Sequence, residues 1–446
     1  MRGKPLVIDA RAPSLMYNNR YEQKGMVGLM SKKRVYAALQ IGDREVRLLV
    51  YEVFDGRFNV LRVEHMPHQG VKDQKIVDES AVVKAIQKAA SNAQASLGYR
   101  IERVLLVIPG LNITRSAKKV KVALEEGSRS VRLFHVQQGY STARDVPAPE
   151  GTELIMTART LYNVNGQETR KLPVGEECDE FEMTTDLIYG DRDLLYSYAR
   201  AVEQSNMEVL DISLDAQNAA QETTALQLSD DRPVIQLLVE PDHTSLAFFT
   251  GGRLMTVSSL PTGYMHFIQS LQRKYDLSDA VAWRLLQNIF SMKMEENSDI
   301  TVYIEQRGDE RIEISADELA KAAVPRIRQW VREINDACEP LLGAGKVRYI
   351  VSGEGANIPV MAEAIADLNA ESQLYLPTTI GARSGSYVPL LGAGYSFQEQ
   401  NRIQHNERNS VNANQLEASL ESIRRHDDRE EGSFTRKLKN VILQAE

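Results

Sequence analysis

The sequence predicts an α/β protein built from two like halves that face one cleft. The same unit, three strands joined by turns and followed by a helical pattern, occurs twice, about 200 residues apart. The first copy occupies 34–65 and the second occupies 233–263. In each copy a short polar turn joins the first two strands, and a glycine turn joins the second to the third. Duplication of such a unit favours a protein with two halves, each with its own sheet.

Composition agrees with a folded chain of more than one domain. The 446 residues are 43% hydrophobic and 26% charged, which excludes a disordered chain, and the net charge of −8 argues against a general nucleic-acid binder. Two distant cysteines, Cys178 and Cys338, indicate neither a disulfide framework nor a cysteine-based metal site. No apolar run reaches the length of a membrane span, so any membrane contact is expected to be peripheral.

The first half follows a segment, residues 1–30, that has no sustained periodicity and is expected to be a flexible extension. The first core is expected to comprise 31–110 and 190–228. Within it, apolar residues on one face predict a helix over 77–97, which Gly98 ends. The other expected elements are strands at 34–40, 46–53, 57–65, 101–110 and 208–215, and a helix from Asp191 to Ser205.

Between the two parts of that core, residues 111–189 change pattern. Short amphipathic pieces alternate with turns rich in proline, glycine and asparagine, which predicts a small inserted subdomain. The segment 228–233 is expected to be the hinge between the halves.

The second half is expected over 229–397, with an outer subdomain at 264–345. Ser315 and Glu318 form a capping-box pattern before a long helix, which Pro325 is expected to kink or break. The other expected elements are strands at 233–239, 245–249, 253–263, 347–352 and 373–376, helices at 264–275, 278–292 and 359–368, and a hairpin at 300–314. Residues 398–432 are polar and charged and are expected to be a disordered linker.

The doubled unit resembles the actin, Hsp70 and hexokinase superfamily. The order of features from Arg34 to Ser396 more closely resembles the bacterial cell-division family FtsA. The segments that carry this resemblance are RKLPVGEECDEFEMTTDLIYG (170–190), FFTGGRL (248–254), LSDAVAWR (277–284) and VSGEGANIP (351–359). The resemblance implies an actin-like duplicated fold with an FtsA-type insertion, and it implies self-assembly contacts through that insertion.

The resemblance also implies where a nucleotide would lie. In this superfamily the first turn of each half holds the ATP phosphates through inward backbone N–H groups, and carboxylates hold magnesium. The second turn should contain an aspartate, three glycines and a threonine. In this chain those positions are Leu238, Glu240, Pro241, Asp242 and His243. Proline has no N–H, and two carboxylates would repel phosphate by about 4 kcal/mol for charges about 4 Å apart at an effective dielectric near 20.

The remaining nucleotide positions are altered as well. Gln40 and Asp43 flank the first turn where the family has an acid and a hydroxyl, and Val281 and Arg284 stand where it has a glutamate and a lysine. The sequence therefore predicts no catalytic residue, no hydrolysis, and weak or absent binding of ATP and magnesium. The candidate residues of this degenerate cleft are Gly42, Asp43, Asp242, His243, Arg284, Gly353 and Gly355. A glycine turn such as 353–355 is also common as a purely structural feature.

The last residues, 433–446, predict an amphipathic helix with an apolar stripe and adjacent cations. Such a helix after a linker is typical of an in-plane membrane anchor on anionic lipid, although it could instead dock on the core or on a partner. FtsA ends in this way, which favours the membrane. The expected membrane-binding residues are Phe434, Arg436, Lys437, Leu438, Lys439, Val441 and Ile442.

The favoured function is a cell-division scaffold on the cytoplasmic face of the membrane at the division site. The resemblance implies three partners: the C-terminal tail of FtsZ, other copies of this chain, and the anionic inner leaflet. An acidic tail would meet basic residues of the outer subdomain, and the candidates are Lys293, Arg326 and Arg328, which are also ordinary solvated helix charges. The alternatives are an ATP-dependent kinase or ATPase of the superfamily and a pilus-assembly adaptor of the same fold.

Overall fold

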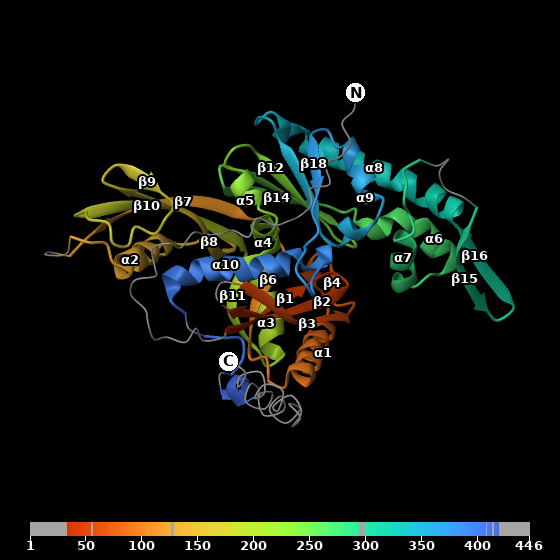
Figure 1. Cartoon of the computed structure of the whole chain (residues 1–446), viewed down its shortest axis with the longest axis horizontal. Helices are drawn as coiled ribbons and strands as arrows, with labels where there is room; N and C mark the ends of the chain where they lie inside the picture. Colours follow the sequence, from red (N-terminus) through yellow and green to blue (C-terminus); the bar gives the residue numbers. More distant parts are fainter. Residues whose placement is uncertain are drawn as a thin grey trace, which may run out of the picture.

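Two five-stranded sheets of the same plan form the centre of the molecule (Figure 1). The computed structural model describes residues 34–54, 57–125, 129–293, 299–406, 408–412 and 414–418. The sheets have the strand orders β11-β6-β1-β2-β3 and β14-β13-β12-β17-β18. In each, an antiparallel three-stranded meander is extended by parallel strands next to its first strand. The predicted duplicated, actin-like α/β fold is confirmed.

The first half begins with the meander β1 (Arg34–Ile41), β2 (Glu45–Phe54) and β3 (Arg57–Pro67). The other elements of this half are β4 (Val71–Lys72), β5 (Lys75–Ile76), α1 (Glu79–Leu97), β6 (Arg103–Ile108), α3 (Arg192–Gln204), β11 (Glu208–Leu214), α4 (Asp215–Glu222) and α5 (Ala225–Leu228). The predicted end of α1 is confirmed, because Gly98 adopts φ 78°, which glycine does without steric cost. Asp191 caps α3 by accepting from the Leu194 N–H at 3.0 Å.

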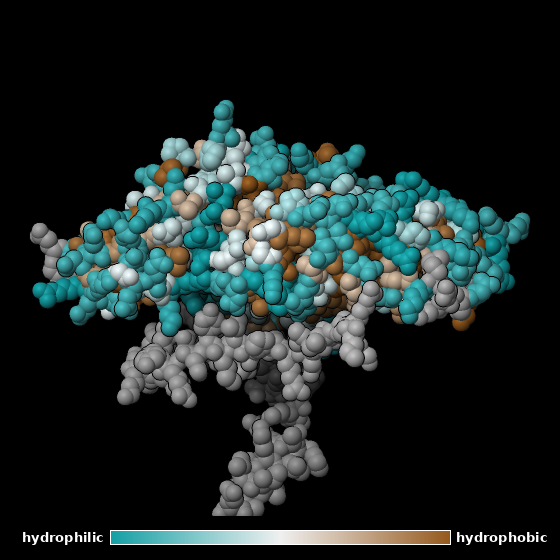
Figure 2. All heavy atoms as spheres, turned by 90° about the horizontal axis from the view of Figure 1, so that it is seen from above, coloured by the Kyte–Doolittle hydropathy of each residue, from teal (hydrophilic) through white to brown (hydrophobic). Residues whose placement is uncertain are grey.

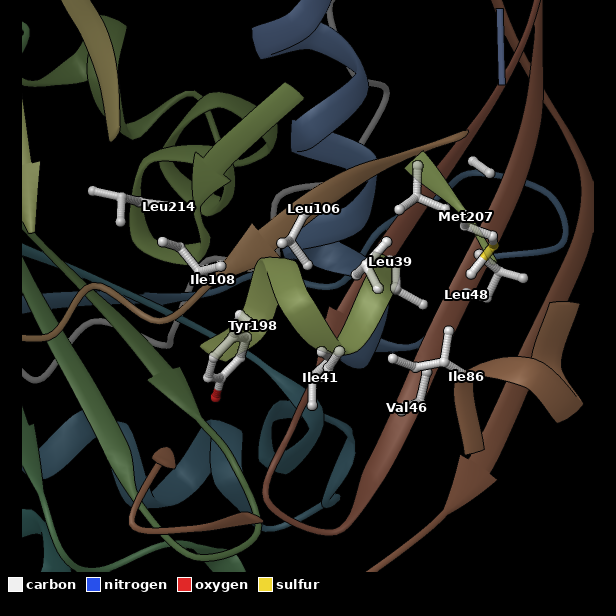
Figure 3. Packing of buried hydrophobic residues seen from close by; sticks show 14 of the residues in the cluster. Leu39, Ile41, Val46, Leu48, Ile86, Leu106, Ile108, Tyr198, Met207 and Leu214 are labelled. Atoms are coloured by element: carbon white, nitrogen blue, oxygen red, sulfur yellow. The ribbon is translucent and has the colours of Figure 1, made fainter. Parts of the chain in front are cut away.

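Helices cover both faces of the first sheet. Residues of α1 and α3 pack on one face, where Figure 3 shows Ile86 and Tyr198 beside Leu39 and Leu106 of the sheet. The helix α10 (Val388–Gln404) packs on the opposite face, against β1, β2 and β6. Because both faces of the sheet are covered, the sequence of β1 is a nearly continuous run of apolar residues, which is typical of buried strands.

The inserted segment forms a four-stranded sheet of its own, with the order β7-β10-β8-β9. Its elements are β7 (Thr114–Ala123), α2 (Leu133–Arg144), β8 (Thr152–Val164), β9 (Gln167–Thr169) and β10 (Glu180–Asp191). Figure 1 shows this sheet beside the second-half strands, at the far end of the molecule from the hairpin β15–β16. A separate small core, which includes Val136, Phe181 and Met183, holds α2 on it.

The second half repeats the plan and carries an outer helical layer. Its sheet strands are β12 (Val234–Val239), β13 (Thr244–Thr250), β14 (Arg253–Leu260), β17 (Arg348–Ser352) and β18 (Glu371–Leu374). The outer layer holds η1 (Tyr264–Ile268), α6 (Gln269–Tyr275), α7 (Asp279–Leu286), β15 (Thr301–Arg307), β16 (Glu310–Ser315) and α8 (Ala316–Leu342). The remaining helices are η3 (Glu354–Asn357), α9 (Met361–Ala364), η4 (Ile365–Asp367) and η5 (Gly385–Tyr387).

Two expectations for the outer layer were wrong. Pro325 does not break α8, because the buried neighbours Val324, Ile327 and Trp330 hold the helix on the core. Each such side chain contributes about 1.5–3 kcal/mol, which outweighs the roughly 3 kcal/mol that an internal proline costs. The helix expected at 278–292 ends at Leu286, and Ser278 caps its start.

The linker expected from residue 398 also begins later than predicted. The helix α10 continues to Gln404, and residues 408–412, here called the strap, lie against the first sheet. The strands β1 and β6 pair only from Ala38 onward, so the backbone groups before that point need other partners. Ser410 supplies them: its N–H donates to the Val35 carbonyl at 2.9 Å, and its Oγ accepts from the Ala37 N–H at 2.9 Å.

The described surface is mostly hydrophilic, with apolar residues in small groups near the middle of the face in Figure 2. Among the described helices, none combines the length and the hydrophobicity of a membrane span. The expected N-terminal extension, residues 1–30, and the amphipathic helix at 433–446 lie outside the described residues.

Candidate functional site

The turn after β1 and the turn after β12 face each other across the boundary between the halves. The structure brings together four predicted cleft residues here, Gly42, Asp43, Asp242 and His243. The cavity between the turns has a volume of about 30 Å³, close to that of one or two water molecules. It is lined by Gln40, Ile41, Gly42, Asp43, Arg44, Glu45, Arg47, Gln74, Pro109, Tyr198, Asp215, Leu238, Glu240, Pro241 and His243.

Arg44 spans the cleft. Its Nε and Nη2 donate to the two carboxylate oxygens of Asp242 at 2.7 and 2.6 Å, and its Nη1 donates to Asp279 at 2.5 Å. Asp279 is the first residue of α7. The paired hydrogen bonds that Arg44 donates to Asp242 are the largest of the effects that raise the pKa of Arg44. A two-pronged contact of this kind fixes the distance and the orientation of the two turns.

A second contact joins the same two turns. His243 Nδ1 lies 2.9 Å from Asp43 Oδ2, and the other carboxylate oxygen of Asp43 accepts from the Gln74 N–H at 2.9 Å. Burial alone would lower the pKa of His243, but the hydrogen bond and the charge of Asp43 outweigh it and raise that pKa. Burial would likewise raise the pKa of Asp43, but the hydrogen bond from His243 and its charge lower it. The pair is therefore favoured as imidazolium and carboxylate.

Arg47 is a third residue that joins the two turns. It binds carboxylates from three parts of the chain. It is 1% exposed and bonds to Glu45 at 2.6 Å, to Glu240 at 2.9 Å and to Glu354 at 2.8 Å. Burial opposes its charge, but the three carboxylates raise its pKa well above the ordinary value. Burial also raises the pKa of Glu354, whereas hydrogen bonding from His65 and the charge of Arg47 overcome burial and lower that of Glu45 to about 2. Arg47 thus ties both turns and the 353–355 turn together.

One backbone donor of each turn is bonded within its own turn. The Gly42 N–H donates to the Glu45 carbonyl at 2.9 Å, and the Glu240 N–H donates to the His243 carbonyl at 3.0 Å. Pro241 has no N–H to offer. These donors are therefore not directed at a ligand between the turns.

Gly353 and Gly355 have a packing role in this structure. Gly353 has φ 89°, and a Cβ there would lie 2.6 Å from the backbone nitrogen of Val239. A Cβ at Gly355 would lie 2.5 Å from the Val239 side chain. The glycines let the turn approach the end of β12, which directs the intervening Glu354 toward Arg47.

Magnesium and ATP do not fit the residues arranged in this way. Nucleotide-sized ligands need cavities of roughly 300–1,000 Å³, and the space between the turns is far smaller. The cationic side chains that could bind phosphates, Arg44 and Arg47, already bond to carboxylates. Within the described ranges, no group of three or more His, Cys, Asp or Glu residues is placed to hold a metal ion.

The structure places the other predicted residues elsewhere. Arg284 does not line the cleft, because it lies on α7 near Tyr303 of the outer hairpin. Lys293 and Arg328 come close together, since Arg328 Nη2 donates to the carbonyl of Met292 at 2.9 Å. Arg326 bonds to Gln329 on the solvent side of α8. The predicted membrane-binding residues, from Phe434 onward, lie outside the described part of the chain.

Sequence reasoning missed the residues that neutralise the cleft, which are Arg44, Arg47, Asp279 and Glu354. A signal was present, since basic residues follow Gly42 and acidic residues occupy the equivalent turn of the second half. In the sequence, the turn that contains Glu240 and Asp242 has no lysine or arginine of its own. Their arginine partners are almost 200 residues away in the sequence, at separations of 193 and 198.

The chain is similar to known proteins in both sequence and fold. No family model matches the chain. It is 23% identical over 371 residues to the cell division protein FtsA of Bacillus subtilis, which covers 81% of this chain and 83% of that protein. It is 22% identical over 369 residues to FtsA of Streptococcus pneumoniae, covering 81% and 80%.

Among solved structures, a chain of the PilM–PilN type IV pilus biogenesis complex superposes with a TM-score of 0.51 at 11% identity, covering 81% of this chain and 98% of that one. That likeness concerns the fold alone. Along most of its length the chain is similar in sequence to the cell-division protein FtsA, and its fold is duplicated and actin-like.

Proposed function

We propose that the chain is an actin-like scaffold of cell division that holds FtsZ at the cytoplasmic face of the membrane without hydrolysing ATP. The similarity to FtsA supports the division role. The observation that carries the absence of hydrolysis is the Arg44–Asp242 contact, which lies where the phosphate loops of the superfamily face each other. Hydrolysis needs a bound metal and a positioned water, and the side chains that surround this cleft bond to one another.

The surface that we assign to the FtsZ tail lies on the outer subdomain. Phe290, Lys293 and Arg328 lie together there, because Arg328 bonds to the carbonyl of Met292 between the other two residues. Phe290 is 69% exposed, so its ring is accessible to a partner. An exposed aromatic ring beside two cations suits a short peptide that carries both apolar and acidic residues.

A pull-down with the C-terminal tail of FtsZ from the same organism tests this assignment. The full-length chain should bind the tail, and the double variant Phe290→Ser with Lys293→Glu should lose about tenfold or more in affinity, since interface anchors are worth more than about 1 kcal/mol each. The matched control is Lys88→Glu, an exposed position on α1 of the first half and therefore outside this surface. Equal binding by the double variant would remove this surface from the proposal, and no binding by the full-length chain would remove FtsZ as the partner.

Attachment to the membrane rests on the sequence of residues 433–446 and on the place where the described chain ends. The strap holds the chain against the first half, and a helical turn at 414–418 follows it. The first part of the linker expected from residue 398 therefore belongs to the folded chain. Assembly with other copies is proposed through the inserted subdomain, where Phe134 of α2 is exposed.

The fold also supports a second candidate, a pilus-assembly adaptor, because the PilM chain superposes on most of this one. That likeness carries no sequence information at 11% identity, whereas the FtsA relatives match along the sequence. The FtsZ-tail experiment separates the two candidates, since a pilus adaptor has no reason to bind that tail. Steady release of phosphate from ATP by the purified chain would instead favour an ATPase of the superfamily.

A further inference from the structure

A cluster of arginines lies where the inserted sheet meets the second half. It consists of Arg115 on β7, Arg159 on β8, Arg170 after β9 and Arg253 on β14, with the aspartates Asp186 and Asp230. We call these six residues the arginine cluster. The two glycines of the β13–β14 turn lie against it: a Cβ at Gly251 would lie 3.6 Å from Arg159 Nη1, and a Cβ at Gly252 would lie 3.5 Å from Arg170 Nη1.

The two aspartates of the cluster form ion pairs with three of its arginines. Arg115 Nη1 lies 2.8 Å from Asp186 Oδ1, and Arg253 Nε lies 3.3 Å from Asp186 Oδ2. Arg170 forms a two-pronged contact with Asp230. The cluster therefore contains four guanidinium groups and only two carboxylates. This leaves it with two positive charges in excess.

Arg159 is the arginine of the cluster that forms no ion pair with either aspartate. Within the part of the chain that the structure describes, no hydrogen bond or ion pair satisfies it, and its Nε is buried without an acceptor. Burial, followed by the charges of Arg170 and Arg253, lowers the pKa of Arg159. A buried donor of a charged group is ordinarily satisfied, and leaving one without an acceptor costs free energy. A water molecule could accept the hydrogen bond, but it would not offset the excess charge.

We propose that the arginine cluster binds a phosphate group, with Arg159 as its central donor. The cluster is open to solvent, because the side chains of Arg170 and Arg253 are 47% and 32% exposed. A tetrahedral phosphate presents oxygens in several directions and can accept from more than one guanidinium, whereas a carboxylate is matched by a single fork. The site lies outside the cleft and is independent of the FtsZ-binding function proposed above.

Titration calorimetry of the full-length chain with inorganic phosphate tests the proposal. The titration is run at constant ionic strength with chloride as the balancing anion, because exposed cations respond to salt alone. We expect saturable binding with a Kd on the order of 1 mM or tighter. The variant Arg159→Gln should weaken it by about ten- to a hundredfold, the worth of one hydrogen bond between charged groups. Arg159→Lys keeps the charge but loses the fork, so its affinity should fall between the two.

Two controls separate a binding role for Arg159 from a structural one. Arg332→Gln removes an exposed arginine from α8, outside the cluster, and should leave phosphate binding unchanged. In chloride alone, Arg159→Gln should melt at the wild-type temperature or above it, because it removes a cation that its neighbours repel. A binding arginine gives this combination, lost affinity with unimpaired stability, whereas a structural arginine would lower the melting temperature.

The source of the phosphate group is distinguished by repeating the titration with AMP. Tighter binding of AMP than of inorganic phosphate would assign the cluster to a phosphomonoester, and weaker binding would assign it to the free ion; both results keep the site. The proposal is overturned if the wild-type chain shows no saturable binding at about 10 mM phosphate, roughly ten times the expected Kd. It is equally overturned if Arg159→Gln and Arg159→Lys bind as the wild type does.

Discussion

Arg44 and Asp242 lie in equivalent turns of the two halves and meet across the cleft through two hydrogen bonds of 2.7 and 2.6 Å. Arg44 comes from the turn after β1, and Asp242 comes from the turn after β12. Here the carboxylate of one turn is the ligand of the guanidinium of the other. The carboxylates that make the second turn unsuitable for phosphate are thereby neutralised by the first half.

The first prediction is that the purified chain binds magnesium-ATP weakly or not at all and does not turn it over. A nucleotide would have to break the Arg44–Asp242 and His243–Asp43 contacts and compete with the bonds that the Gly42 and Glu240 N–H groups form within their turns. Calorimetry with magnesium-ATP, together with a phosphate-release assay, measures this. A dissociation constant in the low micromolar range would contradict it. Binding of ATP that Arg159→Gln abolishes would instead place the nucleotide phosphates at the arginine cluster.

The second prediction concerns Arg47. Replacing it by methionine leaves the largely buried Glu45, Glu240 and Glu354 close to one another without an arginine, and only Glu45 keeps a basic neighbour, His65 at 3.0 Å. Loss of one member of a buried charge network costs about 3–5 kcal/mol, so the midpoint of urea unfolding should fall strongly. Arg332→Met, at an exposed position, should change stability by no more than about 0.5 kcal/mol. If Arg47→Met were as stable as that control, the three carboxylates would have to be protonated in the folded chain.

The third prediction is a pH dependence from the His243–Asp43 pair. The pKa of His243 is raised above its ordinary 6.5, so its contribution is complete below that pH and is lost as the pH rises through the folded-state value. The pKa of Asp43 is lowered from 3.8, so its contribution is present above that pH and is lost as the pH falls through the folded-state value. The pair should therefore stabilise the fold most between about pH 4 and 6.5.

The measurement is the unfolding free energy of the wild type minus that of His243→Gln at several pH values. The comparison with a variant is necessary because Asp215 and Glu240 also face His243, and the pKa of buried Asp215 is itself raised to about 6. The difference should shrink from pH 6 to pH 9, as His243 loses its proton in the folded chain. A difference that stays constant over this range would show that His243 is not charged in the folded chain.

The fourth prediction concerns the strap. A chain that ends at residue 404 loses the hydrogen bonds of Ser410 to the first sheet and the burial of Val411 and Leu416. The loss should be about 3 kcal/mol or more. A chain that ends at residue 418 keeps these contacts and should be as stable as the full chain. Equal stability of the two truncated chains would mean that the strap does not hold to the sheet in solution.

The fifth prediction follows from the sequence of residues 433–446. The full-length chain should sediment with anionic liposomes, and a chain that ends at Gly432 should stay in solution, because burying four apolar side chains gains about 6–12 kcal/mol before ordering costs. Changing Leu438 and Ile442 to aspartate should mimic the truncation, and added salt should weaken binding. If the truncated chain sediments as well as the intact one, docking of the helix on the core or on a partner becomes the better interpretation.

The sequence was sufficient for the elements whose signals are local. The doubled meander, the stop of α1 at Gly98 and the cap of α3 at Asp191 were all predicted and are confirmed. Each of these depends on a turn residue or on a periodic pattern that a short window contains. The helix through Pro325 was not predicted, because buried neighbours that pack on the core from both sides of the proline override its local preference.

The strap and the cleft were missed for a different reason. Ser410 and Val411 lie in a segment whose composition is that of a linker, and only the gap between β1 and β6 gives them a place. The candidates Asp43, Asp242 and His243 lie between the two turns, and their partners come from other turns and helices. Complementary charge across large sequence separations, as between Arg47 and Glu354, is a property of the folded chain.

The Arg44–Asp242 contact also determines which variables control the closure of the cleft. When a nucleotide joins two halves, the closed fraction follows the nucleotide concentration in the cell and therefore its energy supply. When the joining groups belong to the chain, their effective concentration is fixed by the fold, and closure requires no ligand. The remaining external variable is ionic strength, because both side chains are about one-third exposed and their attraction is partly screened by salt. The two halves of this protein would then keep the same relative position in a starved cell and in a growing one.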